Sequence, residues 1–220
     1  VAACLLITAD KGLAGAYNQN AIRQAQQLLS DHEGAVLYVV GEYGRRWFSQ
    51  RGIPIEKSFL YTAQNPTLQR ARQISELLLE RYDAGEINAV HVIYTDMKNG
   101  LEATVRQAQL LPLHRERFSI AKADTAGGSM FEFVPNAAAV LDNAVRSCLT
   151  GFIYSALVDS FCSEQSARMT AMNAADQNAE ELLKDLSVQY NRARQGAITQ
   201  EITEVSAGER AQRSKKEKEG

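Results

Sequence analysis

The chain has two parts that differ in the spacing of their hydrophobic residues. Up to about residue 135, short apolar runs alternate with segments in which apolar residues recur every three or four positions. The runs have the length of strands, and the periodic segments have the spacing of amphipathic helices. From residue 136 to about residue 206 the sequence contains no proline and only two glycines, Gly151 and Gly196. The pattern therefore predicts a mixed domain followed by one very long helix.

The first part is typical of an α/β domain. The expected strands are residues 2–9, 35–40, 89–95, 105–113 and 131–134, and the expected helices are 18–30, 42–51 and 66–82. The first helix carries Ala21, Ile22, Ala25, Leu28 and Leu29 on one face. Strands that alternate with helices and are apolar on both faces favour a parallel sheet covered by helices. We expect a small, mainly parallel sheet flanked by helices, with one or both of the last two strands antiparallel at an edge and a glycine-containing loop at 121–129.

The second part has the repeat of a left-handed coiled coil. At 1.5 Å per residue, the predicted helix would be about 100 Å long. From Ala179 to Ala197 its apolar residues are spaced alternately by four and three, which is the 3.5-residue repeat of a coiled coil. The predicted seam is Met172, Ala175, Ala179, Leu183, Leu186, Tyr190, Ala193 and Ala197, with Met169 extending it upstream. No other segment is long and regular enough to cover this seam, so its partner helix is expected in another molecule or in a part of the protein outside these 220 residues.

The composition is that of an ordinary soluble protein. Apolar residues make up 45% and charged residues 23%, and a net charge of −2 gives no electrostatic reason to expect nucleic acid. The cysteines Cys4, Cys148 and Cys162 form no CxxC pair, so we expect a reducing compartment and three buried or half-buried thiols. No apolar run reaches the roughly 18 residues that a membrane helix needs.

The candidates for chemistry are few. Residues 10–18 (DKGLAGAYN) lie between a strand and a helix, where phosphate-binding loops are found, but they match neither the GxGxxG nor the GxxxxGK[ST] spacing. We interpret them as a tight turn of small residues. The histidines His32, His91 and His114 match no metal-ligand or catalytic spacing, so we expect core or surface roles. The sequence predicts no catalytic residue, metal site or cofactor.

Three segments carry a family resemblance. Residues 163–172 read SEQSARMTAM, residues 190–204 read YNRARQGAITQEITE, and residues 7–15 read ITADKGLAG. Shorter markers lie between them in order: Asn65-Pro66, the QLLP of 109–112, and Leu141-Asp142. From about residue 3 to about residue 206, the chain resembles the gamma subunits of F-type ATP synthases.

This resemblance implies a rotor subunit rather than a catalytic one. It implies a central stalk that couples rotation of the membrane c-ring to ATP synthesis or hydrolysis in the hexamer of alpha and beta subunits, with the epsilon subunit beside the α/β domain. Arg194, Gln195, Thr199 and Glu201 match the positions that contact the catch loops of the beta subunits. The competing interpretation of these four residues is a merely polar coiled-coil surface.

The resemblance also implies a division of the chain and a location. Residues 1–135 would form the foot domain, 136–206 the shaft helix and 207–220 a charged flexible tail. The family carries a long N-terminal helix before the first strand, which would be the seam's partner and which these 220 residues lack. If the source is bacterial, the protein would lie on the cytoplasmic face of the plasma membrane as a peripheral part of the ATP synthase, without spanning the membrane.

Two other functions remain open from the residues alone. The chain could be a small α/β nucleotide-binding module with a helical dimerisation arm, in which case a ligand is expected at the turn of residues 12–18. It could also be a scaffold protein that uses the long helix to form homodimers. Nucleotide binding would distinguish the first alternative, and a concentration-dependent molecular mass would distinguish the second.

Overall fold

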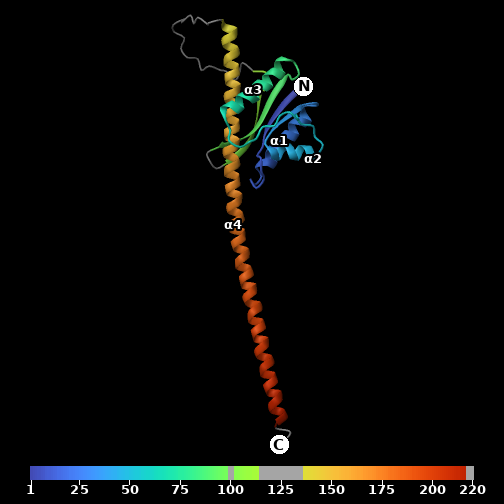
Figure 1. Ribbon diagram of the computed structural model, residues 1–220, viewed down its shortest axis with the longest axis vertical. Coiled ribbons are helices and arrows are strands. Elements are labelled where there is room, and N and C mark those ends of the chain that lie inside the picture. Colours follow the sequence, from blue (N-terminus) through green and yellow to red (C-terminus); the bar gives the residue numbers. More distant parts are fainter. Residues whose placement is uncertain (99–101, 114–135, 217–220) are drawn as a thin grey trace, which may run out of the picture. The chain divides into compact units, whose positions relative to one another are not determined.

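The fold is described from a computed structural model in which residues 1–98, 102–113 and 136–216 are placed. The strands are β1 (Ala2–Ile7), β2 (Val36–Val40), β3 (Ala89–Lys98) and β4 (Glu102–Leu111). The helices are α1 (Tyr17–Asp31), α2 (Glu42–Gln50), α3 (Leu68–Asp83) and α4 (Ala137–Lys216), as labelled in Figure 1. The strand predicted at 131–134 and the loop predicted at 121–129 lie outside the described residues. The chain divides into two compact units, Val1–Ala171 and Met172–Gly220.

The sheet has the order β2-β1-β3-β4. β1 pairs in parallel with both β2 and β3, and β3 pairs antiparallel with the edge strand β4. The mainly parallel sheet with an antiparallel edge strand is therefore confirmed. The β3–β4 hairpin is longer than predicted, because cross-strand pairing extends β3 to Lys98 and starts β4 at Glu102. Polar side chains connect the two strands in this extension: Arg106 Nε of β4 forms an ion pair with Asp96 Oδ2 of β3 at 2.6 Å.

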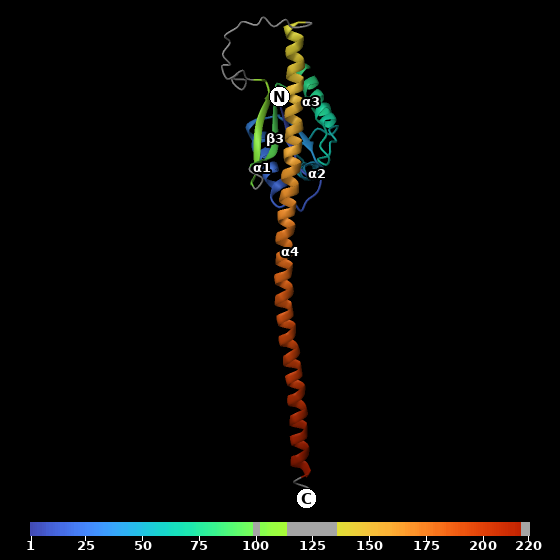
Figure 2. The same cartoon turned by 90° about the vertical axis from the view of Figure 1, so that its left-hand side faces the viewer.

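Helices cover both faces of the sheet in the first unit. Figure 2 shows the sheet between α1 on one side and α3 on the other. Leu5, Ile7 and Val40 pack against α3 and the first part of α4 on one face, while Leu6 and Val39 pack against α1 and α2 on the other. All six residues of β1 are buried, as expected for a central strand covered on both faces. The predicted apolar face of α1 is confirmed: Ala21, Ile22, Ala25 and Leu28 are buried and Leu29 is half-buried.

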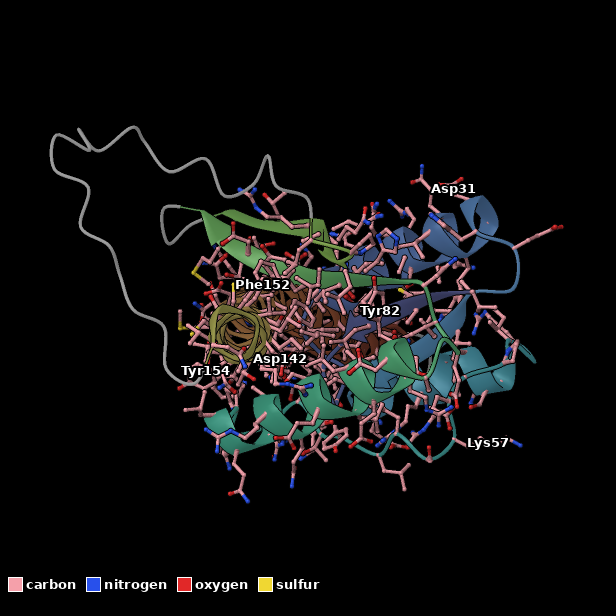
Figure 3. All side chains as sticks on the ribbon, turned by 90° about the horizontal axis from the view of Figure 1, so that it is seen from above. Asp31, Lys57, Tyr82, Asp142, Phe152 and Tyr154 are labelled. Carbon is pink, nitrogen blue, oxygen red and sulfur yellow. The ribbon has the colours of Figure 1, made fainter. Side chains whose placement is uncertain are left out.

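The first part of α4 packs on the sheet. Leu149, Ile153, Ala156 and Leu157 are buried in the same core cluster as α3. Half-buried Phe152, labelled in Figure 3, meets Tyr94 of β3 edge to face, with ring centroids 5.7 Å apart. This part of α4 therefore belongs to the compact unit of the sheet, whereas the division expected from periodicity fell at residue 135.

The long helix begins and ends at identifiable residues. Asn136 Oδ1 accepts a hydrogen bond from the backbone N–H of Ala139 at 2.8 Å, which caps the first turn of α4. At the other end α4 continues past Ser206 to Lys216, so the part of the predicted flexible tail that the structure describes is helical. Good helix formers dominate this segment, and Glu209 and Arg213 form an i,i+4 ion pair at 2.9 Å. No helix in the described ranges is both long and apolar enough to cross a membrane.

The expectation for the cysteines was wrong at two of three positions. Cys4 is buried, and burial raises the pKa of its thiol to about 12. Cys148 and Cys162 are exposed. Both lie on α4 off the face that packs on the sheet, which composition alone cannot reveal.

Candidate functional site

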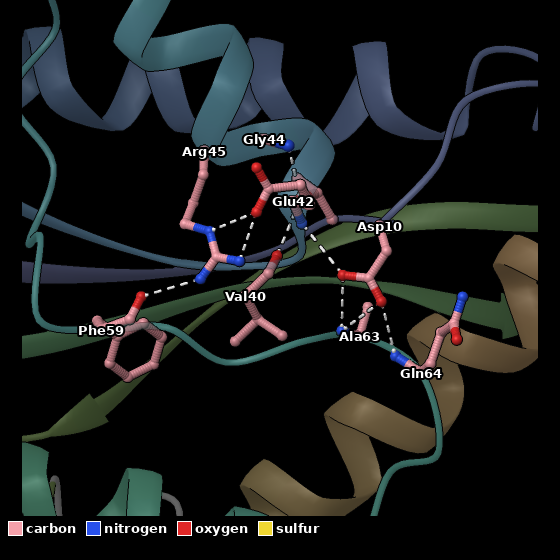
Figure 4. Close-up of polar contacts among 9 residues, drawn as sticks. Asp10, Val40, Glu42, Gly44, Arg45, Phe59, Ala63 and Gln64 are labelled. Carbon is pink, nitrogen blue, oxygen red and sulfur yellow. Dashed lines mark hydrogen bonds and ion pairs between the residues drawn. The ribbon is translucent and has the colours of Figure 1, made fainter.

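The turn after β1 is held together by its own polar groups. The carboxylate of Asp10 accepts hydrogen bonds from the backbone N–H groups of Glu42, Ala63 and Gln64, each at 3.1 Å (Figure 4). Asn18 Oδ1 accepts from the N–H of Ala9 at 2.9 Å. The side chains of Asp10 and Asn18 are therefore engaged in fixing the turn, with Asp10 bonded to α2 and to the segment before α3.

A second set of contacts fixes α2 against the end of β2. The hydroxyl of Thr8 donates to the carbonyl of Val40 at 2.9 Å and accepts from the N–H of Gly44 at 3.1 Å. Within α2, Arg45 pairs with Glu42 Oε2 at 2.6 Å, and its guanidinium also donates out of the helix to the carbonyl of Phe59 at 3.3 Å (Figure 4). These bonds make the β1–α1 turn and the start of α2 one rigid corner of the sheet.

An open cleft of about 430 Å³ lies beside this corner. Tyr43, Arg46 and Trp47 of α2 and Lys11 of the turn line it. The guanidinium of Arg51 lies 3.8 Å from the centre of the Trp47 ring, a cation–π contact. The nucleotide-binding alternative would need a phosphate-binding loop beside this cleft, and the sequence of residues 10–18 lacks the glycine spacing of such a loop.

The structure brings two histidines together that sequence spacing left apart. The rings of His32, after α1, and His91, on β3, have centroids 5.1 Å apart. Burial and the neighbouring His32 lower the pKa of His91. The two histidines are far apart in the sequence, so the pair could be predicted only by knowing that the end of α1 lies beside β3. No cluster of three or more His, Cys, Asp or Glu side chains suited to a metal occurs within the described ranges; His114 lies outside them.

The unit Met172–Gly220 exposes the whole predicted seam. Met172, Leu183, Leu186 and Tyr190 are 42%, 64%, 58% and 67% exposed. The alanines at positions 175, 179, 193 and 197 are exposed as well. A helix of this length with an uncovered apolar stripe loses the packing from which helices in proteins take most of their stability. The stripe is therefore the strongest candidate for an interaction surface in the described part of the chain.

The seam as predicted misses the apolar residues near its end. Ile198, Ile202 and Val205 are 48%, 61% and 73% exposed and are spaced by four and three, whereas the seam would continue from Ala197 at residues 200 and 204. On an ideal helix these three residues lie roughly 60–120° around the axis from Met172 and Tyr190. They form a second exposed apolar face beside the seam.

The four polar residues singled out in this unit lie on two neighbouring faces. Arg194 and Glu201 are seven residues apart, and Gln195 and Thr199 are four apart, so each pair shares a face of the helix. All four are exposed. Thr199 Oγ1 donates within the helix to the carbonyl of Gln195 at 2.8 Å. Arg194 and Glu201 form no ion pair with any residue that the structure places, which leaves both charges available to a partner.

The family model and the relatives that match this chain all carry the name ATP synthase. A family model described as ATP synthase matches residues 1–211. The ATP synthase gamma chain of Caldanaerobacter subterraneus subsp. tengcongensis is 44% identical over 212 residues, covering 93% of this chain and 71% of the relative. That of Ruminiclostridium cellulolyticum is 37% identical over 209 residues, covering 94% and 71%.

Solved structures show the same fold. The central stalk and c-ring structure of Tetrahymena thermophila mitochondrial ATP synthase contains a chain that is similar with a TM-score of 0.60 and 26% identity, over 80% of this chain and 76% of that one. A chain of the Euglena gracilis mitochondrial ATP synthase has a TM-score of 0.69 over 98% of this chain and 74% of its own, and at 16% identity it supports the fold alone.

Proposed function

Because the chain belongs to the ATP synthase gamma-chain family, we propose that it is the rotor of the central stalk of a proton-transporting F-type ATP synthase. It couples rotation of the c-ring mechanically to ATP synthesis or hydrolysis in the alpha and beta subunits. The observation that carries this function is the exposed apolar stripe of the Met172–Gly220 unit, which needs a partner along its length.

The protein contributes no catalytic group of its own. The turn after β1, where a nucleotide would be sought, has its carboxylate bonded to three backbone N–H groups and lacks a phosphate-loop sequence. ATP chemistry takes place in the neighbouring subunits, and this chain changes their conformational equilibrium through contacts that differ as it turns. Its partners are the alpha and beta subunits, the epsilon subunit and the c-ring. The named bacterial relatives favour a peripheral position on the cytoplasmic face of the plasma membrane.

The seam takes a second helix from outside residues 1–220. Its alanines come in pairs, Ala175/Ala179 and Ala193/Ala197, on either side of Leu183, Leu186 and Tyr190, and small residues let two helix backbones approach closely. The partner helix therefore packs tightly at the alanine positions and interlocks at Leu183, Leu186 and Tyr190. This makes the shaft a two-stranded coiled coil.

Arg194, Gln195, Thr199 and Glu201 contact the beta subunits. Their exposure and the unpaired charges of Arg194 and Glu201 support this role. Polar residues on two faces of one helix give the rotor an asymmetric surface. Each beta subunit in turn meets a different set of donors and acceptors.

Substitutions at these four positions test the function. In membrane vesicles that carry the ATP synthase containing this chain, Arg194→Ala and Glu201→Ala should each lower ATP-driven proton pumping about tenfold, because a hydrogen bond to a charged group contributes about 1.5 kcal/mol. Gln195→Ala and Thr199→Ala remove neutral groups and should have smaller effects. Arg192→Ala, exposed on the same helix, is the matched control. If all four variants pump like this control, the four residues do not carry the contact.

A further inference from the structure

The buried face of α4 changes from apolar to polar where β1 ends. Leu149, Ile153, Ala156 and Leu157 form its apolar part. At the same three- and four-residue spacing, the face continues with Ser160, Ser163 and Glu164, which are 1%, 0% and 4% exposed. Polar side chains thus occupy positions that helix periodicity assigns to a core.

Ser160 and Ser163 hydrogen-bond to the backbone of β3 beyond the point where β1 ends. β1 pairs with β3 only as far as Leu6 opposite Ile93. Two residues further along β3, the N–H of Thr95 donates to Ser160 Oγ at 3.2 Å, and the hydroxyl of Ser163 donates to the carbonyl of Thr95 at 3.3 Å. Backbone groups that are buried need partners. Two hydroxyls one helical turn apart supply both the acceptor and the donor for Thr95.

An ion pair one turn further on ties α4 to the turn after β1. Arg168 Nη1 lies 2.7 Å from Glu164 Oε1, and Arg168 Nη2 donates to the carbonyl of Gly12 at 3.3 Å. Burial together with the charge of Glu164 raises the pKa of the phenol of Tyr17, at the start of α1. The polar contacts therefore join α4 to both β3 and the β1–α1 corner.

We propose that Ser160 and Ser163, supported by the Glu164–Arg168 pair, are positioning residues that lock the rotational and axial register of α4 on the sheet. Apolar packing is non-directional, so the apolar part of the face holds α4 to the sheet without fixing one register sharply. Hydrogen bonds are directional, and buried polar groups are best known for fixing register. A displacement of α4 by one residue would break both bonds to Thr95.

This lock rests on the proposed rotor function for its consequence. Torque between the sheet unit and the rest of α4 has to pass through the contact between α4 and the sheet. If α4 could slip in register on the sheet, part of each rotational step would be lost in that slippage, and less torque would be transmitted along the helix. The lock therefore makes proton transport and ATP turnover strictly coupled.

The test compares Ser160→Ala/Ser163→Ala with Ser147→Ala/Ser155→Ala, whose serines are exposed on the same helix. In the assembled ATP synthase, hydrogen exchange at the Thr95 amide should rise about tenfold in the first variant and stay unchanged in the control, since a net hydrogen bond is worth about one factor of ten. ATP-driven pumping per ATP hydrolysed should fall in the first variant only. Mere destabilisation would lower the amount of assembled enzyme and leave this ratio unchanged.

Ser163→Ala alone keeps the test decisive if the double variant fails to fold. It should show a smaller loss of the same ratio, because it removes only the bond to the Thr95 carbonyl and keeps the bond of the Thr95 N–H to Ser160. Unchanged pumping per ATP in a folded variant would overturn the lock. An unaltered chain whose complex hydrolyses ATP without any pumping would instead count against the rotor function itself, so the two failures are distinguishable.

Discussion

Replacing Leu183 and Leu186 with aspartate should abolish ATP-driven proton pumping by the ATP synthase that contains this chain. Both side chains are more than half exposed on the seam, at 64% and 58%. Covering them with a partner helix gains about 2 kcal/mol each. Two carboxylates in the same place would instead be buried without partners, at a cost of several kcal/mol more. Acidification of inverted vesicles on addition of ATP measures the effect.

The control for this experiment lies on the same helix. Glu181→Ala and Lys184→Ala change exposed residues beside the seam and should leave pumping near the unaltered level. Thermal unfolding of the Val1–Ala171 unit should not change in the aspartate variant, because its core contains no residue of the seam. Pumping by the aspartate variant at the level of these controls would show that the seam is not a buried interface.

Substituting Gly41 with alanine should destabilise the sheet unit by about 4 kcal/mol. Gly41 ends β2 with φ +96°, in the region that side chains rarely adopt, and this strain costs about 1–3 kcal/mol. A β-carbon there would also meet the backbone oxygen of Thr8 and lie 2.7 Å from that of Ala9, so overpacking adds a similar amount. The midpoint of urea unfolding, followed by the fluorescence of Trp47, measures the loss.

Gly34→Ala separates the two contributions to this effect. Gly34 has φ +77° but no atom within 4 Å of where a β-carbon would lie, so only the strain remains. This strain should cost about 1–2 kcal/mol. Equal stability of the two variants would mean that the corner between β1, β2 and α2 is not closely packed at Gly41.

Periodicity predicted the fold well because each element follows a local rule. The apolar runs became β1, β2 and β3, and the helical repeats became α1, α2 and α3 within two residues of their expected bounds. The exact ends could not be predicted, since they depend on pairing and capping between distant segments. Thr67, for example, caps α3 by accepting from the N–H of Arg70, so this helix begins at Leu68 and not at Pro66.

The contacts that position the functional elements were beyond sequence reasoning. Ser160 and Ser163 look like polar interruptions of an amphipathic helix until β1 is seen to end opposite them. The contact between His32 and His91 also joins residues that are far apart in the sequence. The same holds for Asp10, whose hydrogen-bond partners lie 32 or more residues away. Such contacts follow from the sheet register, which a pattern of hydrophobic residues does not specify.

Hydrogen exchange along residues 182–205 tests most directly whether this helix is one strand of a two-stranded shaft. In the isolated, monomeric chain these amides should exchange far faster than those of β1 and β3, because a single exposed helix gains little from propensity alone. In the assembled ATP synthase the same amides should become protected. Strong protection of this segment in the monomer would contradict the account.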